Sequence, residues 1–316
     1  MQYVGIETQR VRNNAYSVLL LLAFPCLIVF LTFLFAYLLV WAGSKEQVNE
    51  TASPMEMASA FTWAALPYVV GGVSLWFVIA YFANTSIINA ATGARPLERK
   101  ENKRVYNLVE NLCVSQGMTM PRVNVINDDS LNAYASGVNA RTYAVTLTTG
   151  IIRKLNDDEL EGVIAHELSH IRHRDVRLLI VSIVFVGIFA MLAGMAQKAL
   201  LYSTAYRGNK KNNGAVLLII LIVVAVIGYF FANLTRLAIS RKREYMADAG
   251  AAAMTGKPLA LASALRAISA DPDVEAVKRD DVAQLFIEHP SRKNALSGLF
   301  ATHPPIQKRI EVLEQF

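Results

Sequence analysis

The sequence predicts a mainly α-helical membrane protein, with about four transmembrane helices and an α+β domain that contains a small sheet. Hydrophobic residues make up 54% of the 316 residues and charged residues only 18%, a composition typical of a chain that lies in a bilayer. Four uncharged runs reach the roughly 20 residues that a helix needs to cross a bilayer. Short segments in a polar region, by contrast, have the residue pattern of strands.

The uncharged runs divide the chain into alternating polar and apolar segments. We predict a tail (1–14), transmembrane helix 1 (15–44), an external loop (45–57), transmembrane helix 2 (58–84), a first domain part (85–177), hydrophobic helix 3 (178–197), a basic loop (198–213), hydrophobic helix 4 (214–235) and a second domain part (236–316). The first run is much longer than the core of a signal peptide, which has about 7–15 residues, so we expect a retained anchor.

The distribution of basic residues sets the predicted orientation. Arg10 and Arg12 precede the first run, and the stretch "RPLERKENKR" follows the second. Because positive residues favour the cytoplasmic side, we predict that the tail and both domain parts are cytoplasmic. The basic loop at 198–213 does not fit this scheme, so the third and fourth runs are expected either to protrude from the membrane or to form a shallow hairpin.

The formal net charge of +6 comes mostly from residues that flank the uncharged runs. This pattern is typical of contact with lipid headgroups, and the sequence lacks the motifs and interleaved aromatic residues of nucleic-acid binding. The predicted partner is therefore the lipid bilayer and not nucleic acid. Cys26 lies in the first run and Cys113 in a polar region, so the cysteines predict neither a disulfide framework nor a thiolate metal site.

Both domain parts contain recognisable local patterns. Apolar residues at helical spacing in "ENKRVYNLVENLCVSQG" predict a helix that stops near Gly117. "RVNVIND" predicts a short strand, and "TYAVTLTTG" alternates sides as a strand does. In "NDDELEGVIAHELSHI", Asn156 and Glu159 have the spacing of a capping box at a helix start. The second domain part is predicted to be mostly helical, with Pro258 early in one helix and a final helix near "PPIQKRIEVLEQF".

His166, Glu167 and His170 form an H-E-x-x-H pattern on the predicted helix. Residues four apart lie one above the other on a helix, so both imidazoles can share one tetrahedral zinc ion. Glu167 is rotated off that face, where it can act as a general base toward a water molecule. The alternative is a solvated helix face on which histidine and glutamate are incidental.

A hydrolytic zinc site takes a third protein ligand and leaves one position open. His173 lies about 10 Å from His166 along the helix axis, too far to share the ion, and is expected to face the surface or the headgroups. In "SRKREYMADAG", Glu244 and Asp248 are four residues apart on a second predicted helix. Glu244 can be the third ligand, and Asp248 can accept the N–H of a ligating imidazole. An exposed acidic pair in a basic helix is the alternative.

These ligands also constrain the topology. His170 precedes the third run and Glu244 follows the fourth. One ion can bind both residues only if the chain crosses the membrane an even number of times between them, which two spans satisfy. The site is then expected at the cytoplasmic surface, where it could act on chains that emerge from the bilayer.

Five motifs, "NAYASG", "TTGII", "HELSHI", "REYMADAG" and "THPPIQKRI", follow one another after the second run. With them the sequence resembles the HtpX-like integral membrane zinc metallopeptidases, the family that also includes the prenyl-protein (CAAX) endopeptidases. The resemblance implies a gluzincin-like cytoplasmic metalloprotease domain with one Zn²⁺ per chain. It implies zinc ligands at His166, His170 and Glu244, a catalytic base at Glu167, an orienting carboxylate at Asp248, further catalytic residues at His303 and Arg309, and substrate-binding residues at Asn132, Ala133 and Tyr134.

The activity that this resemblance implies is hydrolysis of misfolded or membrane-associated proteins at the cytoplasmic face of a bacterial-type inner membrane, in a stress response. An extended substrate could pair with "TYAVTLTTG" if that strand is an exposed edge, which adds Tyr143, Val145 and Leu147 to the expected substrate-binding residues. His303 could instead be a loop residue before the final helix, and His289 is assigned no role.

Other functions remain open at this point. A prenyl-peptide protease is the second enzymatic reading. Outside the enzymes, the histidines could belong to a metal transporter, a metal sensor or an inactive scaffold. The four runs contain no charged residue that could form an ion path, which disfavours a transporter. The natural substrates and the oligomeric state are not predicted.

Overall fold

The structure of the protein is a computed structural model that describes residues 6–43, 53–177, 180, 194, 198, 221–229, 242–270, 286–287 and 304–316. This described part divides into two compact units. One unit takes its residues from 18–81 and 182–235, and the other from 1–17, 82–181 and 236–316. The first unit is apolar, and the second contains a sheet and the expected metal ligands.

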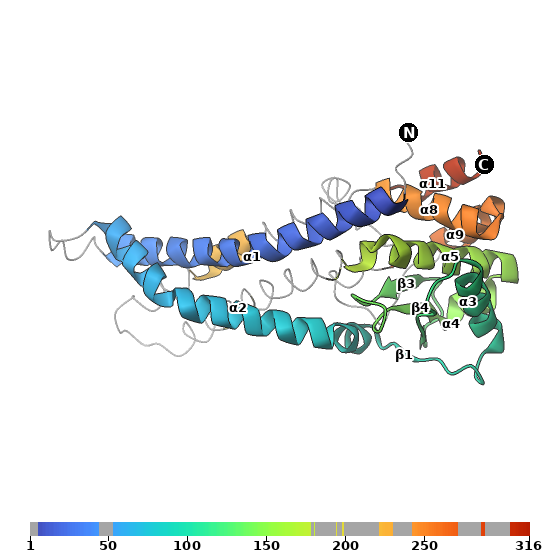
Figure 1. The fold of residues 1–316 in the computed structure, drawn as a ribbon, viewed down its shortest axis with the longest axis horizontal. Coiled ribbons are helices and arrows are strands. Elements are labelled where there is room, and N and C mark those ends of the chain that lie inside the picture. Colours follow the sequence, from blue (N-terminus) through green and yellow to red (C-terminus); the bar gives the residue numbers. More distant parts are fainter. Residues whose placement is uncertain are drawn as a thin grey trace. The chain divides into compact units, whose positions relative to one another are not determined.

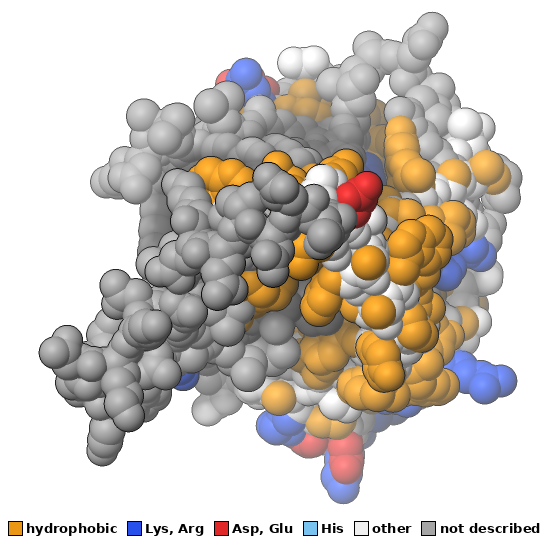
Figure 2. Space-filling model, turned by 90° about the vertical axis from the view of Figure 1, so that its left-hand side faces the viewer, with side chains coloured by type: hydrophobic (Ala, Val, Ile, Leu, Met, Phe, Trp, Pro, Cys, Tyr) orange, Lys and Arg blue, Asp and Glu red, His pale blue; other side chains and the backbone are white. Residues whose placement is uncertain are grey.

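The apolar unit takes most of its described residues from the helices α1 (Ile6–Gly43) and α2 (Pro54–Thr92). Among the described residues, Leu22–Trp41 and Pro54–Ile79 are long and apolar enough to cross a bilayer. The ring of Phe24 packs edge-to-face on Phe77, with centroids 5.8 Å apart. Large hydrophobic side chains such as Trp63 are exposed, and Figure 2 shows hydrophobic side chains over much of the described surface of one face. Exposed apolar surface of this extent is typical of contact with a membrane or a partner.

These two helices overlap the predicted segments 15–44 and 58–84. The prediction of a mainly helical membrane protein with a small sheet is confirmed. Predicted hydrophobic helices 3 and 4 lie largely outside the described residues, although residues 221–229 are helical. Apart from Lys198, the basic loop also lies outside them. Whether these two runs cross the membrane therefore stays a prediction.

Within the described residues, the second unit contains a four-stranded sheet with the strand order β1-β2-β4-β3. Its strands are β1 (Arg95–Pro96), β2 (Arg122–Ile126), β3 (Ala133–Ser136) and β4 (Ala144–Thr148). The two predicted strands, β2 and β4, are parallel neighbours, with Val123 opposite Val145. Each has an antiparallel neighbour on its other side, β1 for β2 and β3 for β4. The apolar side chains of the two central strands are buried.

The position of β4 corrects one expectation. A substrate was expected to pair with this strand if it were an exposed edge, but β4 has a strand on each side. Val145 and Leu147 are fully buried, so an added strand cannot pair beside them. The alternation of residues in β4 identifies a strand but carries no information about its neighbours. The outer strand of the described sheet on this side is β3, whose residues "AYAS" lack β-branched side chains and were not predicted as a strand.

The helices of this unit carry most of the motif residues. They are α3 (Lys103–Ser115), α4 (Thr149–Lys154), α5 (Asp157–His173), α8 (Lys242–Thr255), α9 (Pro258–Ala270) and α11 (Ile306–Leu313). α5 lies between strands β3 and β4 on one side and helices α8 and α9 on the other (Figure 1). It begins with the predicted capping box, in which Asn156 and Glu159 each accept the other's backbone N–H at 3.0 Å. The helix with the H-E-x-x-H pattern is therefore held on both sides.

Candidate metal centre

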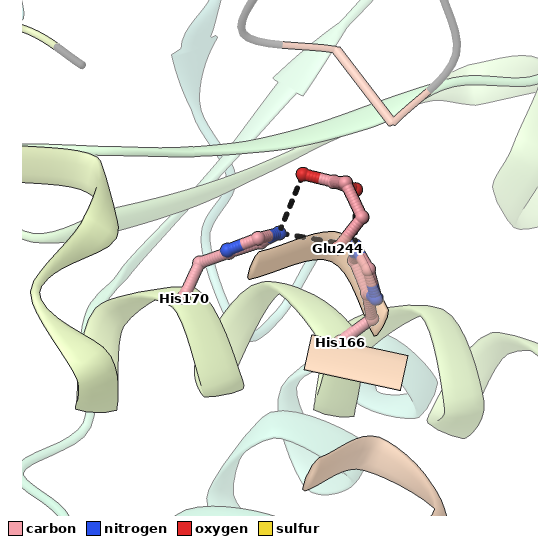
Figure 3. A group of neighbouring side chains, drawn as sticks. All are labelled: His166, His170 and Glu244. Carbon is pink, nitrogen blue, oxygen red and sulfur yellow. Dashed lines mark hydrogen bonds and ion pairs between the residues drawn. The ribbon is translucent and has the colours of Figure 1, made fainter. Parts of the chain in front are cut away.

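Helices α5 and α8 bring three potential metal ligands together (Figure 3). Nε2 of His166 and Nε2 of His170 are 3.1 Å apart. Glu244 places one carboxylate oxygen 3.7 Å from Nε2 of His166 and the other 3.6 Å from Nε2 of His170. The three predicted ligands therefore converge on one point, although Glu244 is far from the histidines in the sequence.

These separations fit a single small cation. Ligand atoms that lie about 2.0–2.2 Å from a tetrahedral ion are roughly 3.3 Å from one another, close to the distances between the three side chains. Two imidazole nitrogens and one carboxylate oxygen suit zinc and related divalent ions. Burial lowers the pKa of His166, but its hydrogen bonds to Asp248 and Glu244 outweigh this and raise the pKa to about 9. A metal ion must therefore displace a proton when it binds.

Glu167 follows His166 on α5 and is only 2% exposed. Burial raises the pKa of its carboxyl group above the ordinary value, and the carboxylate of Glu244 adds to this effect. This rise in pKa is opposed by three nearby groups that lower it, namely His166, His170 and Arg309. A carboxyl group whose pKa moves toward neutral pH is suited to accept and then return a proton.

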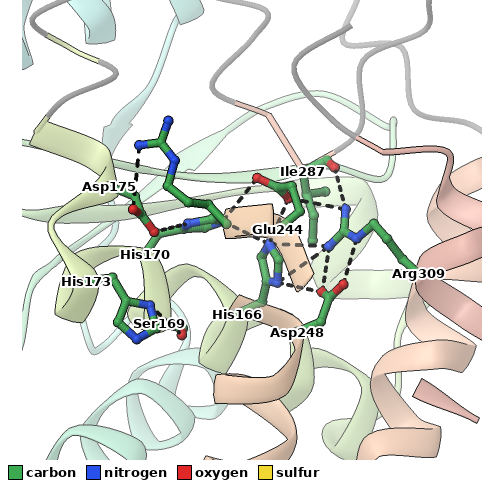
Figure 4. Close-up of polar contacts among 10 residues, drawn as sticks. His166, Ser169, His170, His173, Asp175, Glu244, Asp248, Ile287 and Arg309 are labelled. Carbon is green, nitrogen blue, oxygen red and sulfur yellow. Dashed lines mark hydrogen bonds and ion pairs between the residues drawn. The ribbon is translucent and has the colours of Figure 1, made fainter. Parts of the chain in front are cut away.

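The ring of His166 is held from the side opposite the cluster. Its Nδ1 lies 2.9 Å from Oδ1 of Asp248, one turn after Glu244 on α8 (Figure 4). Arg309, from α11, donates to both Asp248 oxygens, from Nε at 2.9 Å and from Nη2 at 2.8 Å. Burial alone raises the pKa of Asp248, but Arg309 and His166 outweigh it and hold the pKa below its usual value. The carboxylate therefore stays charged and can accept the imidazole N–H.

Arg309 was expected near the active site as a catalytic residue, and in the structure it lies beside the three potential metal ligands. Its guanidinium is fully buried and lies 3.5 Å from Glu244 Oε2. Two of its nitrogens, however, are bound to Asp248, and Nη1 donates to the backbone oxygen of Ile287 at 3.2 Å. In this arrangement Arg309 positions Asp248. Its predicted partner in catalysis, His303, lies outside the described residues.

Asp175 is a residue of this cluster that the sequence analysis missed. Its Oδ2 lies 3.2 Å from Nδ1 of His170. The sequence signal was weak, because Asp175 follows His170 by five residues and a continuing helix would not direct it to that ring. Helix α5 instead ends at His173, and the capping residue Arg174 has a left-handed conformation with φ of 61°. The resulting turn brings Asp175 back beside His170.

His173 does not face the surface or the headgroups, contrary to expectation. It is only 3% exposed, and its Nδ1 lies 3.5 Å from Oγ of Ser169. The reason is the close packing of α8 on α5: a Cβ at Gly250 would lie 2.2 Å from Ser169 Oγ and 3.8 Å from His173 Cε1. Burial lowers the pKa of His173, so it is neutral at physiological pH.

The residues expected to bind substrate separate into two groups. Asn132 and the strand residues Ala133 and Tyr134 lie at β3, which packs against α5. The Tyr134 side chain is fully buried, with its hydroxyl 3.0 Å from Thr92 Oγ1, so it anchors β3. The other group, Tyr143, Val145 and Leu147, lies at β4, which is flanked by strands on both sides.

Comparison with known proteins supports this reading of the cluster. The profile of peptidase family M48 matches residues 99–316, which contain all three potential ligands. The chain belongs to peptidase family M48. It is therefore a metallopeptidase, and the membership implies a bound metal, for which the described residues offer the cluster of His166, His170 and Glu244.

Relatives of the M48 chain extend the likeness beyond the matched region. A protease HtpX homolog of Bacteroides fragilis is 65% identical over 323 aligned residues, covering 100% of both chains. Another, from Dictyoglomus turgidum, is 39% identical and covers 77% of this chain and 81% of its own. Among solved structures, S. mikatae Ste24p aligns with a TM-score of 0.47 at 16% identity, over 80% of this chain and 58% of that one. The two HtpX homologs confirm the resemblance to the HtpX-like membrane metallopeptidases.

Proposed function

We propose that this membrane metallopeptidase is a zinc-dependent endopeptidase of the bacterial cytoplasmic membrane that hydrolyses misfolded or membrane-associated proteins at the cytoplasmic face. The observation that carries the proposal is the convergence of His166, His170 and Glu244 beside the buried Glu167. The cytoplasmic orientation rests on the basic residues that follow the second apolar run.

Each residue of the cluster then has a distinct task. His166, His170 and Glu244 hold one zinc ion, which when bound supplies a Lewis acid and lowers the pKa of a neighbouring water. Glu167 accepts the proton of the attacking water and later donates it to the leaving amine. His303 stays a predicted catalytic residue.

The substrate backbone is proposed to pair with β3 in place of β4. The N–H of Thr148 in β4 donates to the oxygen of Asn132, so the next carbonyl, that of Ala133, points away from β4. That carbonyl accepts the N–H of Ile287 at 3.0 Å. A substrate strand would take the place of Ile287 there. Pairing through the backbone reads few side chains, which suits the hydrolysis of many unfolded sequences.

The test compares the full chain, purified in detergent with a chelator, before and after zinc is added back. Self-cleavage and casein hydrolysis are followed for wild type, Glu167→Gln and the control Glu161→Gln. Glu161 lies on the same helix, but its carboxylate pairs with Lys257 at 2.9 Å. We expect zinc to restore hydrolysis in wild type and control, and Glu167→Gln to bind zinc with hydrolysis slower by about 10²–10⁴-fold.

Two outcomes would overturn parts of the proposal. Normal turnover by Glu167→Gln would exclude this residue as the base. Zinc binding without casein hydrolysis in any variant would exclude broad selectivity, and a farnesylated peptide would then be the next substrate, because cleavage of it identifies a prenyl-peptide protease.

A further inference from the structure

The two histidines of the metal cluster use their rings in the same way. Each directs Nε2 toward the other histidine and Glu244, and each directs Nδ1 toward an aspartate. For His166 that aspartate is Asp248, and for His170 it is Asp175, at 3.2 Å (Figure 4). A ring that donates its Nδ1–H to a carboxylate keeps the Nε2 lone pair free for a metal.

Asp175 is not a surface carboxylate that happens to touch the ring. It is only 6% exposed, and a buried charge is stable only when it is paired. Nη1 of Arg243 lies 3.6 Å from Oδ1 of Asp175, the oxygen that does not face His170. Arg243 is itself 4% exposed, and neither of its Nη atoms makes a hydrogen bond within the described residues. The two buried charges therefore offset each other.

The backbone fixes this arrangement from two directions. Arg174 ends α5 in a left-handed conformation, and its N–H donates to the oxygens of His170 and Ile171. This turn sets Asp175 beside the ring. Arg243 immediately precedes the ligand Glu244 on α8, so one turn of helix carries both a ligand and the partner of Asp175.

We propose that Asp175 is the positioning residue for the metal ligand His170, and that Arg243 holds the Asp175 carboxylate in place. The inference rests on the proposed metal site. Arg243, Asp175 and His170 then form a second Arg–Asp–His chain of side chains, beside the one formed by Arg309, Asp248 and His166. The second chain is looser, because Arg243 Nη1 lies 3.6 Å from Asp175, whereas Arg309 donates two hydrogen bonds below 3.0 Å to Asp248. Loss of Asp175 should therefore cost less metal affinity than loss of Asp248.

Metal affinity, measured without reference to proteolysis, tests this proposal. The full chain in detergent carries Glu167→Gln to suppress self-cleavage, and Co²⁺ binding is followed by visible absorbance and Zn²⁺ binding by competition with a chelator. The variants are Asp175→Ala, Asp175→Asn, Asp248→Ala and the control Asp129→Asn. Asp129 also pairs with an arginine, Arg153, but its side chain is 87% exposed.

We expect Asp175→Ala to weaken binding of both ions by about 10–100-fold, Asp248→Ala to weaken it further, and Asp129→Asn to leave it within about twofold of the parent. The metal affinity of Asp175→Asn should lie between that of the parent and that of Asp175→Ala. An amide oxygen can still accept the imidazole N–H, but it lacks the charge of the carboxylate. Unchanged affinity in Asp175→Ala would overturn the proposal. So would a fall in the melting temperature of the metal-free protein without a change in affinity, since that shows a structural role alone.

The role of Arg243 is tested by a double-mutant cycle. If Arg243 acts through Asp175, Arg243→Gln weakens Co²⁺ binding in the parent but has no further effect in Asp175→Asn. If the losses of Co²⁺ affinity caused by Arg243→Gln and Asp175→Asn add up in the double variant, the link between the two residues is overturned. Failure of the parent to bind either ion would overturn the metal site and this inference together, whereas binding without proteolysis in wild type affects the proposed function alone.

Discussion

The guanidinium of Arg309 makes two hydrogen bonds with the carboxylate of Asp248, at 2.9 and 2.8 Å, across 61 residues of sequence. Both side chains are almost fully buried. The paired contact joins α11 to α8 and holds the carboxylate against Nδ1 of His166. A residue of α11 thus holds the carboxylate that contacts a potential metal ligand on α5.

Substitution of Arg309 should affect the metal site and the fold differently according to what replaces it. Arg309→Lys keeps the charge but cannot make two parallel hydrogen bonds, so we expect weaker zinc binding with a modest change in stability. Arg309→Met leaves the buried Asp248 unpaired and should lower the free energy of unfolding by about 3–5 kcal/mol. Denaturant unfolding and zinc competition measure the two effects. The control is Arg266→Met, which removes a surface pair with Glu314 and should change neither.

The capping box of α5 should contribute measurably to stability. Asn156→Ala removes the acceptor of the Glu159 N–H and should cost about 1 kcal/mol. Because α5 carries both proposed histidine ligands, zinc affinity measures whether the loss of helical structure extends beyond the first turn of α5. We expect a lower melting temperature with zinc affinity nearly unchanged, since α5 is also held by α8, α9 and the sheet. Equal stability of wild type and variant would show that the cap is dispensable.

Gly150 is required by close packing at the start of α4. A Cβ there would lie 1.9 Å from the backbone oxygen of Asp129 and 2.4 Å from that of Ser130, in the loop that leads to β3. Gly150→Ala should therefore destabilise the protein by about 1–3 kcal/mol. Gly72→Ala is the matched control, because a Cβ at Gly72 meets nothing within 4 Å. Similar melting temperatures for the two variants would contradict the packing argument.

Acidification should destabilise the fold through His173. Burial lowers its pKa, with Arg172 and His170 acting in the same direction and Asp175 opposing them. The unfolded chain binds a proton near pH 6.5, whereas the folded chain resists it, so stability is lost as the pH falls below about 6.5.

This effect is measured as a difference between two proteins. The melting temperature of metal-free wild type is compared with that of His173→Asn at about pH 7.5 and about pH 5.5. Because the other histidines are present in both, their titration cancels. We expect the fall in melting temperature to be smaller in the variant, and an equal fall in both would show that His173 does not control it.

The parts of the protein that could be predicted from sequence are those encoded within one or two helical turns. His166 and His170 share a face because four residues make about one turn, and Asn156 caps the same helix because its partner is three residues away. The apolar helices follow from length and composition alone. The spacing of Glu244 and Asp248 indicated two tasks on one helix, and the need of a hydrolytic zinc site for a third ligand linked that helix to the histidines before the family resemblance did.

The tertiary structure decided which side chains meet across long sequence separations. It placed β4 inside the sheet, brought Arg309 to Asp248, and buried His173 under α8. It also turned the chain at Arg174, so that Asp175 reaches His170. Helical periodicity and capping act between residues a few positions apart and are therefore visible in the sequence. Strand order, burial and the pairing of buried charges depend on how distant segments pack, and no local pattern carries that information.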